Sequence, residues 1–446
     1  MVKNKDLLSG PIFPTLISLA IPIMATSFIQ MAYNLTDMIW LGRLGADAVA
    51  SVGAAGMFMW FSNGFATLAK IGGQIKVAHA LGSNNIQKAT KYAQSALQLG
   101  IIFASVFALL TLLFSKQMIG FFNLNSATVE YDARSYLLIT CVFVIFSFFN
   151  QIFTGIFTAM GNSKFSFIAS TIGLLVNIVL DPLFIFGCGF IPAMGVTGAA
   201  IATILAQVIV TLIFFYMIKQ DTILFPHVTF IKNVWKQELK EVLKIGLPTA
   251  LQTMLFSCIS MVIARLIADW GDHAVAIQKV GSQIESISWM TAEGYAAALN
   301  SFVAQNYGAN YLNRIHKGVR ISTKVMLIWG IITTLILLCF PNIIFQIFIN
   351  DQTVLTMGVE YLQILAFSQA FMCLEYASAG AFQGIGKTMP PSIVSIVFTT
   401  TRIPLAIFLS SSMGLNGIWW ALTISSMMKG CVLYIWFYKT AKKLSI

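Results

Sequence analysis

The sequence predicts an all-α polytopic membrane protein in which twelve transmembrane helices form two six-helix lobes related as parallel repeats. Three observations lead to this fold class: the composition, the number of long apolar stretches, and an internal repeat. Of the 446 residues, 58% are hydrophobic and only 10% are charged, and the mean hydropathy is +0.82. A soluble domain has about a quarter of its residues charged. This chain therefore cannot cover a water-facing surface.

The apolar stretches set the number of helices. A helix needs about 20 apolar residues to cross the hydrocarbon core of a bilayer, and twelve such stretches lie between polar segments. The predicted spans are 14–40, 49–70, 92–114, 136–159, 166–187, 194–218, 246–268, 274–299, 321–345, 361–384, 390–411 and 415–438.

The positive charges predict the orientation. Lysine and arginine gather in alternate loops, which makes these loops and both termini cytoplasmic by the positive-inside rule. The net charge of +11 is then a topology signal that suits anionic lipid headgroups, and nucleic-acid binding is not expected. The residues that carry it are Lys3, Lys5, Lys76, Lys88, Lys91, Lys219, Lys232, Lys236, Lys240, Lys244, Arg314, Lys317, Arg320, Lys324, Lys439, Lys442 and Lys443. We expect a multi-pass protein of the cell membrane.

The two halves of the chain repeat each other. IPIMATSFIQ and LPTALQTMLF carry Pro22 and Pro248, which lie 226 positions apart. The same offset relates GADAVA to GDHAVA and VAHALGSNN to VAQNYGANY, and GIFTAMGNSK matches GAFQGIGKTM with an offset of 225. Six spans return the chain to the side on which it started, so the repeats are parallel.

The repeat predicts the domain organisation. Residues 1–220 form an N-lobe, 221–244 a cytoplasmic linker, and 245–446 a C-lobe. This is the ground plan of an alternating-access transporter, with the substrate between the lobes, and we expect a monomer. A duplicated bundle without transport activity is the alternative.

Five acidic residues lie within predicted spans, where a charge costs about 3 kcal/mol on insertion scales. They are Asp37, Asp181, Glu285, Glu293 and Glu375. Such residues usually face a cavity or each other and mark the path of an ion or substrate.

A candidate cation-coupling site lies in the first half. Asn177 and Asp181 are four residues apart and share one helix face, and Thr203 and Asn150 lie on neighbouring helices. If Asp37 approaches them, the ligands are hard oxygens, which suit a proton or Na⁺ and no transition metal. Two such carboxylates are expected to share one proton and to titrate as a pair. The alternative is that each acid has a structural partner.

Glu285, Glu293 and Glu375 are secondary candidates. Lys279 shares a span with the first two, and Arg402 could neutralise Glu375, so internal ion pairing explains all three equally well. The second half has no equivalent of the Asp37–Asp181 pair, because its repeat positions hold isoleucine.

Pro22 is a candidate hinge. It lies early in the first span and removes a backbone hydrogen bond, which would let the helix bend when Asp37 changes charge. A static kink is the alternative.

The opening LLSGPIFPTLISLAIPIMATSFIQMAYNLTDMIWLGRLGADAVA resembles the first helix of the multidrug and toxic compound extrusion (MATE) family. The duplicated VAHALGS and VAQNYGA, and the turns TAMGNSK and FQGIGKT, are also similar to that family. The resemblance implies two six-helix lobes that export organic, often cationic, drugs in exchange for H⁺ or Na⁺, with no cofactor. It gives Asp37, Asn177, Asp181 and Thr203 the cation-site roles and makes Asn150 a neighbour.

The acidic group resembles the DinF-like branch of the family. The NorM-like branch has an acid on the seventh helix, where this chain has Gln252, so a C-lobe Na⁺ site is not expected.

We therefore predict a multidrug efflux antiporter that works by alternating access. A flippase for lipids or lipid-linked oligosaccharides is the alternative, which basic residues in the cavity would favour. An enzyme is not expected, because the four histidines and six cysteines form no catalytic or metal-binding motif.

Overall fold

The computed structural model describes residues 6–122, 124, 126–189, 191–228, 235–347 and 352–443. Lys3, Lys5 and Lys232, part of the predicted cytoplasmic charge, lie outside these residues. The described chain is helical apart from turns and a short bridge between Cys188 and Ile191, so the all-α prediction is confirmed.

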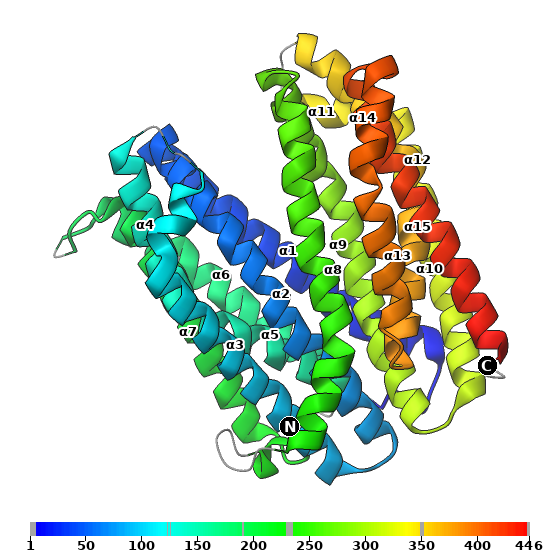
Figure 1. The fold of residues 1–446 in the computed structure, drawn as a ribbon. Helices are drawn as coiled ribbons and strands as arrows, with labels where there is room; N and C mark the ends of the chain where they lie inside the picture. The colour runs from blue at the N-terminus through cyan, green and yellow to red at the C-terminus, as the bar shows by residue number, and fades with distance from the viewer. Residues whose placement is uncertain are drawn as a thin grey trace. The chain divides into compact units, whose positions relative to one another are not determined.

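The helices divide into two compact units. Unit 1 is Met1–Asp6 with Ala25–Ala250, and unit 2 is Leu7–Met24 with Leu251–Ile446. Each is described by itself below, and Figure 1 labels their helices. The lobes and linker predicted from the sequence stay a prediction.

Unit 1 contains most of the helices of the first half, together with the second part of α1 and the first part of α8. Its helices are α1 (Ile12–Leu44), α2 (Ala46–Gly82), α3 (Ile86–Gly120), α4 (Ala127–Val142), α5 (Val144–Ala159), α6 (Ser163–Phe186), α7 (Gly195–Gln220), the 3₁₀ turn η1 (Phe225–His227) and α8 (Lys236–Ala268). Its apolar core lies between α2, α3, α4, α5 and α7.

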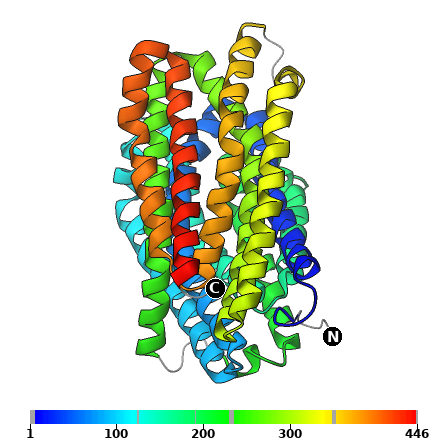
Figure 2. The ribbon, with the colours of Figure 1, turned by 90° about the vertical axis from the view of Figure 1, so that its right-hand side faces the viewer.

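Unit 2 contains the first part of α1 and the rest of α8. Its other helices are α9 (Asp272–Gly308), α10 (Leu312–Cys339), α11 (Pro341–Gln346), α12 (Gln352–Gly384), α13 (Met389–Thr400), α14 (Arg402–Met413) and α15 (Leu415–Lys443). Helix α12 packs against α9, α10 and α15, and α15 also runs along α14, as Figures 1 and 2 show.

Backbone geometry repeats with the sequence. Gly45 and Gly271, which precede α2 and α9, both have positive φ angles (125° and 94°). Asn84 and Asn310, the two described non-glycine residues with positive φ (59° and 58°), are also 226 positions apart. Asparagine tolerates this region better than most residues, so both halves make the same two turns with the same chemistry.

The span count agrees with twelve helices. Among the described residues, eight helices are long and apolar enough to cross a membrane, and two bent pairs raise the number to ten. Helices α2 and α9, which cover the predicted spans 49–70 and 274–299, make twelve.

Two predicted spans are bent, and a third is interrupted at a single residue. The span 136–159 is α4 and α5, bent by 48° at Phe143, and 361–384 bends by 45° between Ala366 and Gln369. The span 390–411 is divided into α13 and α14 at Thr401. Hydropathy measures length and polarity, so it does not detect such bends.

Charged contacts hold the first part of α8 within unit 1. The Glu241 carboxylate accepts hydrogen bonds from Lys76 Nζ and Tyr92 Oη, both at 2.6 Å. Lys91 lies 3.9 Å from Glu238 and 4.0 Å from the centre of the Trp235 ring. We call the three residues Glu241, Lys76 and Tyr92 the Glu241 cluster.

A corresponding arrangement holds the start of α1 within unit 2. Arg314 donates hydrogen bonds to the carbonyls of Ser9 and Gly10, both at 2.8 Å, and Asn306 donates one to the carbonyl of Leu7 at 3.1 Å. Each repeat therefore fixes the segment that leads into a long proline-containing helix.

Candidate functional site

Two acids of unit 1 come together. Asp37 lies on α1 and Asp181 on α6, and their carboxyl groups interact with each other and with the amide of Asn177. Asn177 Nδ2 donates a 2.9 Å hydrogen bond to Asp181 Oδ1, as the four-residue spacing predicts. Asn177 and Asp181 are 0% and 1% exposed. The rest of α6 is mostly apolar, so the packing of this helix places Asp181 in the protein interior.

Four oxygen atoms at this site are fully buried and lack a hydrogen-bond partner. They are Asp37 Oδ1, Asn177 Oδ1, Asp181 Oδ2 and Thr203 Oγ1. A buried polar atom without a partner costs about 1–3 kcal/mol, so a group of four calls for an explanation. A proton shared by the carboxyls, or a cation held by all four oxygens, would supply it. We call these four residues the carboxyl site.

Two tyrosines that were not selected from the sequence border the carboxyl site. Tyr33 lies one turn before Asp37 on α1, and its hydroxyl donates a 3.5 Å hydrogen bond to the carbonyl of Thr203. Tyr136 of α4 is 5% exposed and interacts with Thr203 and with both acids. The spacing of Tyr33 from Asp37 was visible in the sequence, whereas nothing in the sequence distinguishes Tyr136 from other tyrosines of the spans.

Asn150 lies in a different group. Its Nδ2 donates hydrogen bonds to Gln207 Oε1 at 2.8 Å and to the Gln207 carbonyl at 3.0 Å, and its Oδ1 accepts one from Thr211 Oγ1 at 2.8 Å. The amide is thereby used to join α5 to α7. Asp37, Asn177 and Asp181 interact with one another, Thr203 contacts Tyr33 beside them, and Asn150 has partners outside this group; the role of all five as a cation site stays a prediction.

Unit 2 contains a cluster of opposite charges. Glu375 of α12 forms a salt bridge of 3.1 Å with Lys429 of α15, and both side chains are largely buried, at 14% and 9% exposure. Glu285 of α9 faces Arg402 and Lys429 electrostatically and lies beside Gln369. Arg402, which was expected to neutralise Glu375, interacts with it electrostatically, whereas Lys429 is the residue in direct contact. A lysine in the apolar window TISSMMKGCVLY was the signal that the sequence analysis missed.

The other expected pairing does not occur. Lys279 is exposed, and Ser282 donates a hydrogen bond to its backbone carbonyl. Glu293 is exposed on α9 and interacts electrostatically with Tyr376. Glu285 therefore belongs to the cluster with Arg402 and Lys429, and Glu293 lies outside it.

Pro22 lies inside α1 and is buried. Helix α1 passes from unit 2 to unit 1 between Met24 and Ala25, two residues later. The hinge role of Pro22 stays a prediction.

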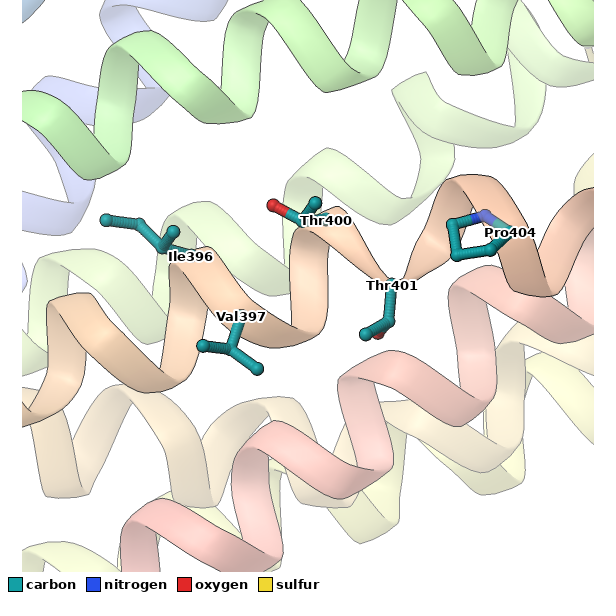
Figure 3. Close-up of a pocket in the computed structure, with 5 residues that line it drawn as sticks. All are labelled: Ile396, Val397, Thr400, Thr401 and Pro404. Atoms are coloured by element: carbon teal, nitrogen blue, oxygen red, sulfur yellow. The ribbon is translucent and has the colours of Figure 1, made fainter.

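A shallow apolar groove follows the break between α13 and α14. Its volume is about 410 Å³, and it is lined by Ile396, Val397, Thr400, Thr401 and Pro404. Figure 3 shows the side chains of Thr400 and Thr401 leaving the ribbon on opposite sides. None of the lining side chains ionises, so the groove itself offers no acid–base or metal chemistry.

Metal-binding chemistry is limited to hard oxygens. The described residues contain no group of three or more His, Cys, Asp or Glu side chains that could hold a metal ion. The carboxyl site offers two carboxylates, an amide oxygen and a hydroxyl, which suit Na⁺ better than a transition metal.

The sequence-family comparison decides the family. The MatE family model matches residues 22–183 and again residues 248–408, once in each half. The chain belongs to the MatE family. It is therefore a MATE transporter, as the resemblance implied.

Individual relatives agree with this family over almost the whole chain. The probable multidrug resistance protein NorM of Thermotoga maritima is 27% identical over 91% of this chain and 87% of its own length. The multidrug export protein MepA of Staphylococcus haemolyticus is 22% identical over 98% of this chain and 95% of its own length. The crystal structure of a MATE protein in complex with MaL6 superposes with a TM-score of 0.92 at 24% identity and covers all of both chains.

The two segments that the family model matches correspond to the two halves of the internal repeat. Each match begins at the proline of the pair Pro22 and Pro248. Asp37 and Asp181 both fall within the first segment, whereas Lys429 lies beyond the second. The charge cluster of unit 2 thus combines residues inside and outside the matched regions.

Proposed function

We propose that this MATE transporter is a multidrug efflux antiporter that exports organic, often cationic, compounds in exchange for H⁺ or Na⁺ by alternating access. The observation that carries the proposal is the carboxyl site, where two acids meet and four buried oxygens have no partner. An ionised pair at this place repels itself, so the site gains most from a proton or cation. The names of the relatives support drugs as the exported compounds.

The carboxyl site can couple the two fluxes through its charge. A proton or Na⁺ from outside neutralises the pair, and Asp37 then transmits the change along α1, which contains Pro22. Release of the cation to the cytoplasm restores the repulsion and resets the site. One charge that moves inward supplies about 2.3 kcal/mol per 100 mV, enough for a concentration ratio of more than tenfold.

The experiment compares dye efflux from energised cells for the wild type, Asp37→Asn and Asp181→Asn. Asparagine keeps the shape of the side chain and removes the titratable group, so we expect efflux to fall at least tenfold in both variants. Asp269→Asn is the matched control, because Asp269 is 60% exposed and pairs with the exposed Arg265. Normal efflux by Asp37→Asn, at equal expression, would contradict the proposal.

The same assay identifies the coupling ion. The pH gradient and the Na⁺ gradient are collapsed separately in everted vesicles, and the collapse that stops efflux names the ion. Efflux that survives both treatments would rule out antiport with either cation.

A second candidate function is a flippase for lipids or lipid-linked oligosaccharides. It is supported by Arg402 and Lys429, two bases within spans of unit 2 that suit a phosphate-bearing headgroup. A wild type that moves no dye but translocates a fluorescent phospholipid in proteoliposomes would favour this function over drug export.

The orientation belongs to the same proposal. Both termini lie in the cytoplasm and the protein resides in the cell membrane as a monomer. A cysteine introduced at the C-terminus of a variant without the six native cysteines should react with a membrane-impermeant maleimide in everted vesicles and stay unreactive in intact cells.

A further inference from the structure

Arg402 of unit 2 donates its hydrogen bonds to neutral groups. Its Nε donates to Ser425 Oγ at 2.7 Å, and its Nη2 donates to Ser426 Oγ at 3.0 Å. Both acceptors are neutral hydroxyls on α15. Among the described residues, no carboxylate lies within 4 Å of the guanidinium, because the salt bridge of this region joins Glu375 to Lys429.

The remaining edge of the guanidinium is open. No nitrogen of Arg402 is both fully buried and without a hydrogen bond. The terminal nitrogen that donates to neither serine therefore keeps accessible surface. Two serines fix the plane of the group, and its free N–H bonds point away from them.

Glu285 is in the complementary situation. It interacts electrostatically with Arg402 and with Lys429, yet it forms no salt bridge within 4 Å in the described part of the chain. Its carboxylate oxygens are likewise absent from the buried atoms without a partner. Unit 2 thus has an ion pair in direct contact, Glu375 with Lys429. Glu285 and Arg402 are opposite charges that interact without such a contact.

Arg402 lies next to a one-residue interruption of its helix. Helix α13 ends at Thr400 and α14 begins at Arg402, so the arginine is the first residue after the interruption. Its guanidinium also lies 5.9 Å from the centre of the Phe256 ring. An arginine in a span is expensive unless it is paired; Glu375 and Glu285 offset the charge of Arg402 only at a distance, because its hydrogen bonds go to two neutral serine hydroxyls.

We propose that Arg402 is a binding site for an oxyanion, a carboxylate or phosphate group of the transported molecule, and that Glu285 takes a cationic group of the same molecule. The site extends the substrate range of the exporter from simple cations to compounds that carry an acidic group. A planar guanidinium binds such groups through two parallel hydrogen bonds, and the two serines hold its plane in place. The inference rests on the proposed export function, whose carboxyl site it does not involve.

The test uses two dyes that differ at one position. Rhodamine 110 carries a free carboxylate, and rhodamine 123 is the same dye with that carboxylate blocked as a methyl ester. Binding of each to the purified full-length protein is measured by fluorescence polarisation, and efflux of each is measured in proteoliposomes. The variants are Arg402→Gln, Arg402→Lys and the control Arg265→Gln, whose side chain is 79% exposed.

We expect the wild type to bind both dyes and Arg402→Gln to lose about tenfold in affinity for rhodamine 110, since hydrogen bonds to charged groups reach this magnitude. Its affinity for rhodamine 123 should stay within twofold, which also shows that the variant is folded. Arg402→Lys should recover part of the loss, because it keeps the charge without the planar fork. Arg265→Gln should change neither dye.

Three outcomes would overturn the proposal: no binding of rhodamine 110 by the wild type, equal losses for both dyes in Arg402→Gln, or no loss for either. Failure of the export function gives a different result. Rhodamine 123 efflux then does not depend on the H⁺ or Na⁺ gradient, while Arg402→Gln still loses affinity for rhodamine 110 only. A further arm adds phosphatidylglycerol or diacylglycerol, which lacks the phosphate, to the wild type. Competition by the phospholipid alone would assign the oxyanion to a lipid headgroup, and no competition would assign it to a soluble substrate.

Discussion

Asn150 provides a residue-scale test of what belongs to the coupling machinery. Its amide is used by Gln207 and Thr211, so Asn150→Ala leaves two polar side chains of α7 with fewer partners. We expect a loss of about 2 kcal/mol in stability, seen as a lower Tm in detergent, with ion-coupled efflux retained in the folded protein. If Asn150→Ala instead uncouples efflux without any change in Tm, Asn150 belongs with the carboxyl site.

Lys429 and Glu375 form the second residue-scale test. Lys429→Met leaves a largely buried carboxylate without its partner, which costs about 3 kcal/mol. The double variant Lys429→Met with Glu375→Gln removes both charges and should recover most of the Tm. For comparison, Arg265→Gln breaks an exposed pair with Asp269 and should have no measurable effect. A double variant no more stable than Lys429→Met would show that the pair is not the source of the loss.

Residue types explain which parts of the carboxyl site were predictable. An acid in an apolar span is expensive, so Asp37 and Asp181 stand out in the sequence, and the four-residue spacing adds Asn177. Tyr136 does not stand out, because an uncharged tyrosine is common in membrane spans. The partner of Glu375 could not be chosen from the sequence either, since the choice between Arg402 and Lys429 depends on how α12 packs against α15.

At the scale of an element, the Glu241 cluster fixes the first part of α8. Burial opposes ionisation of Glu241, but the hydrogen bonds from Lys76 and Tyr92 outweigh it and lower the pKa of this carboxyl below 4.5. A lowered pKa in the folded state means that the stabilisation is present above pH 4.5 and is lost as the pH falls below it.

We therefore expect the amides of 236–250 to exchange faster with deuterium as the pH is lowered through 4.5, after correction for the intrinsic rate. Glu241→Gln should show the fast exchange already at pH 7, with an effect below about 1 kcal/mol because the pair is partly exposed. Glu238→Gln is the control, since its contact with Lys91 is longer, at 3.9 Å. Equal exchange in wild type and Glu241→Gln at pH 7 would contradict this role.

Elements were predictable in number but not in shape. Apolar length predicted one helix for each span, and the structure has bends at Phe143 and between Ala366 and Gln369 within two of them. Each bend follows from local backbone geometry and from packing, neither of which changes the mean hydropathy.

At the scale of the whole molecule, two long helices each belong to both units. Helix α1 changes unit between Met24 and Ala25, and α8 does so between Ala250 and Leu251. The two positions are 226 residues apart, and each follows a proline, Pro22 or Pro248, by two residues. The repeat visible in the sequence predicted that the two halves would share a plan, but not that each would contribute a segment to the other's core.

Proline at these positions weakens the helix where it changes unit. We expect Pro22→Ala and Pro248→Ala to slow rhodamine 123 efflux several-fold while the affinity for the dye stays within twofold, because binding does not require the helix to bend. The control is Pro390→Ala, at the start of α13, where a proline interrupts no helical hydrogen bond. Unchanged efflux in both variants would show that the prolines are static kinks.

The division of α1 and α8 between the units has an evolutionary consequence. A single-repeat ancestor with the same division would have needed a second copy to complete its core, which is reciprocal domain swapping. The division of the present chain is what such a swapped pair would show if its two subunits were joined in one gene. Split within residues 221–235 and co-expressed, the two fragments are expected to associate, because each supplies a segment to the unit that the other mainly forms.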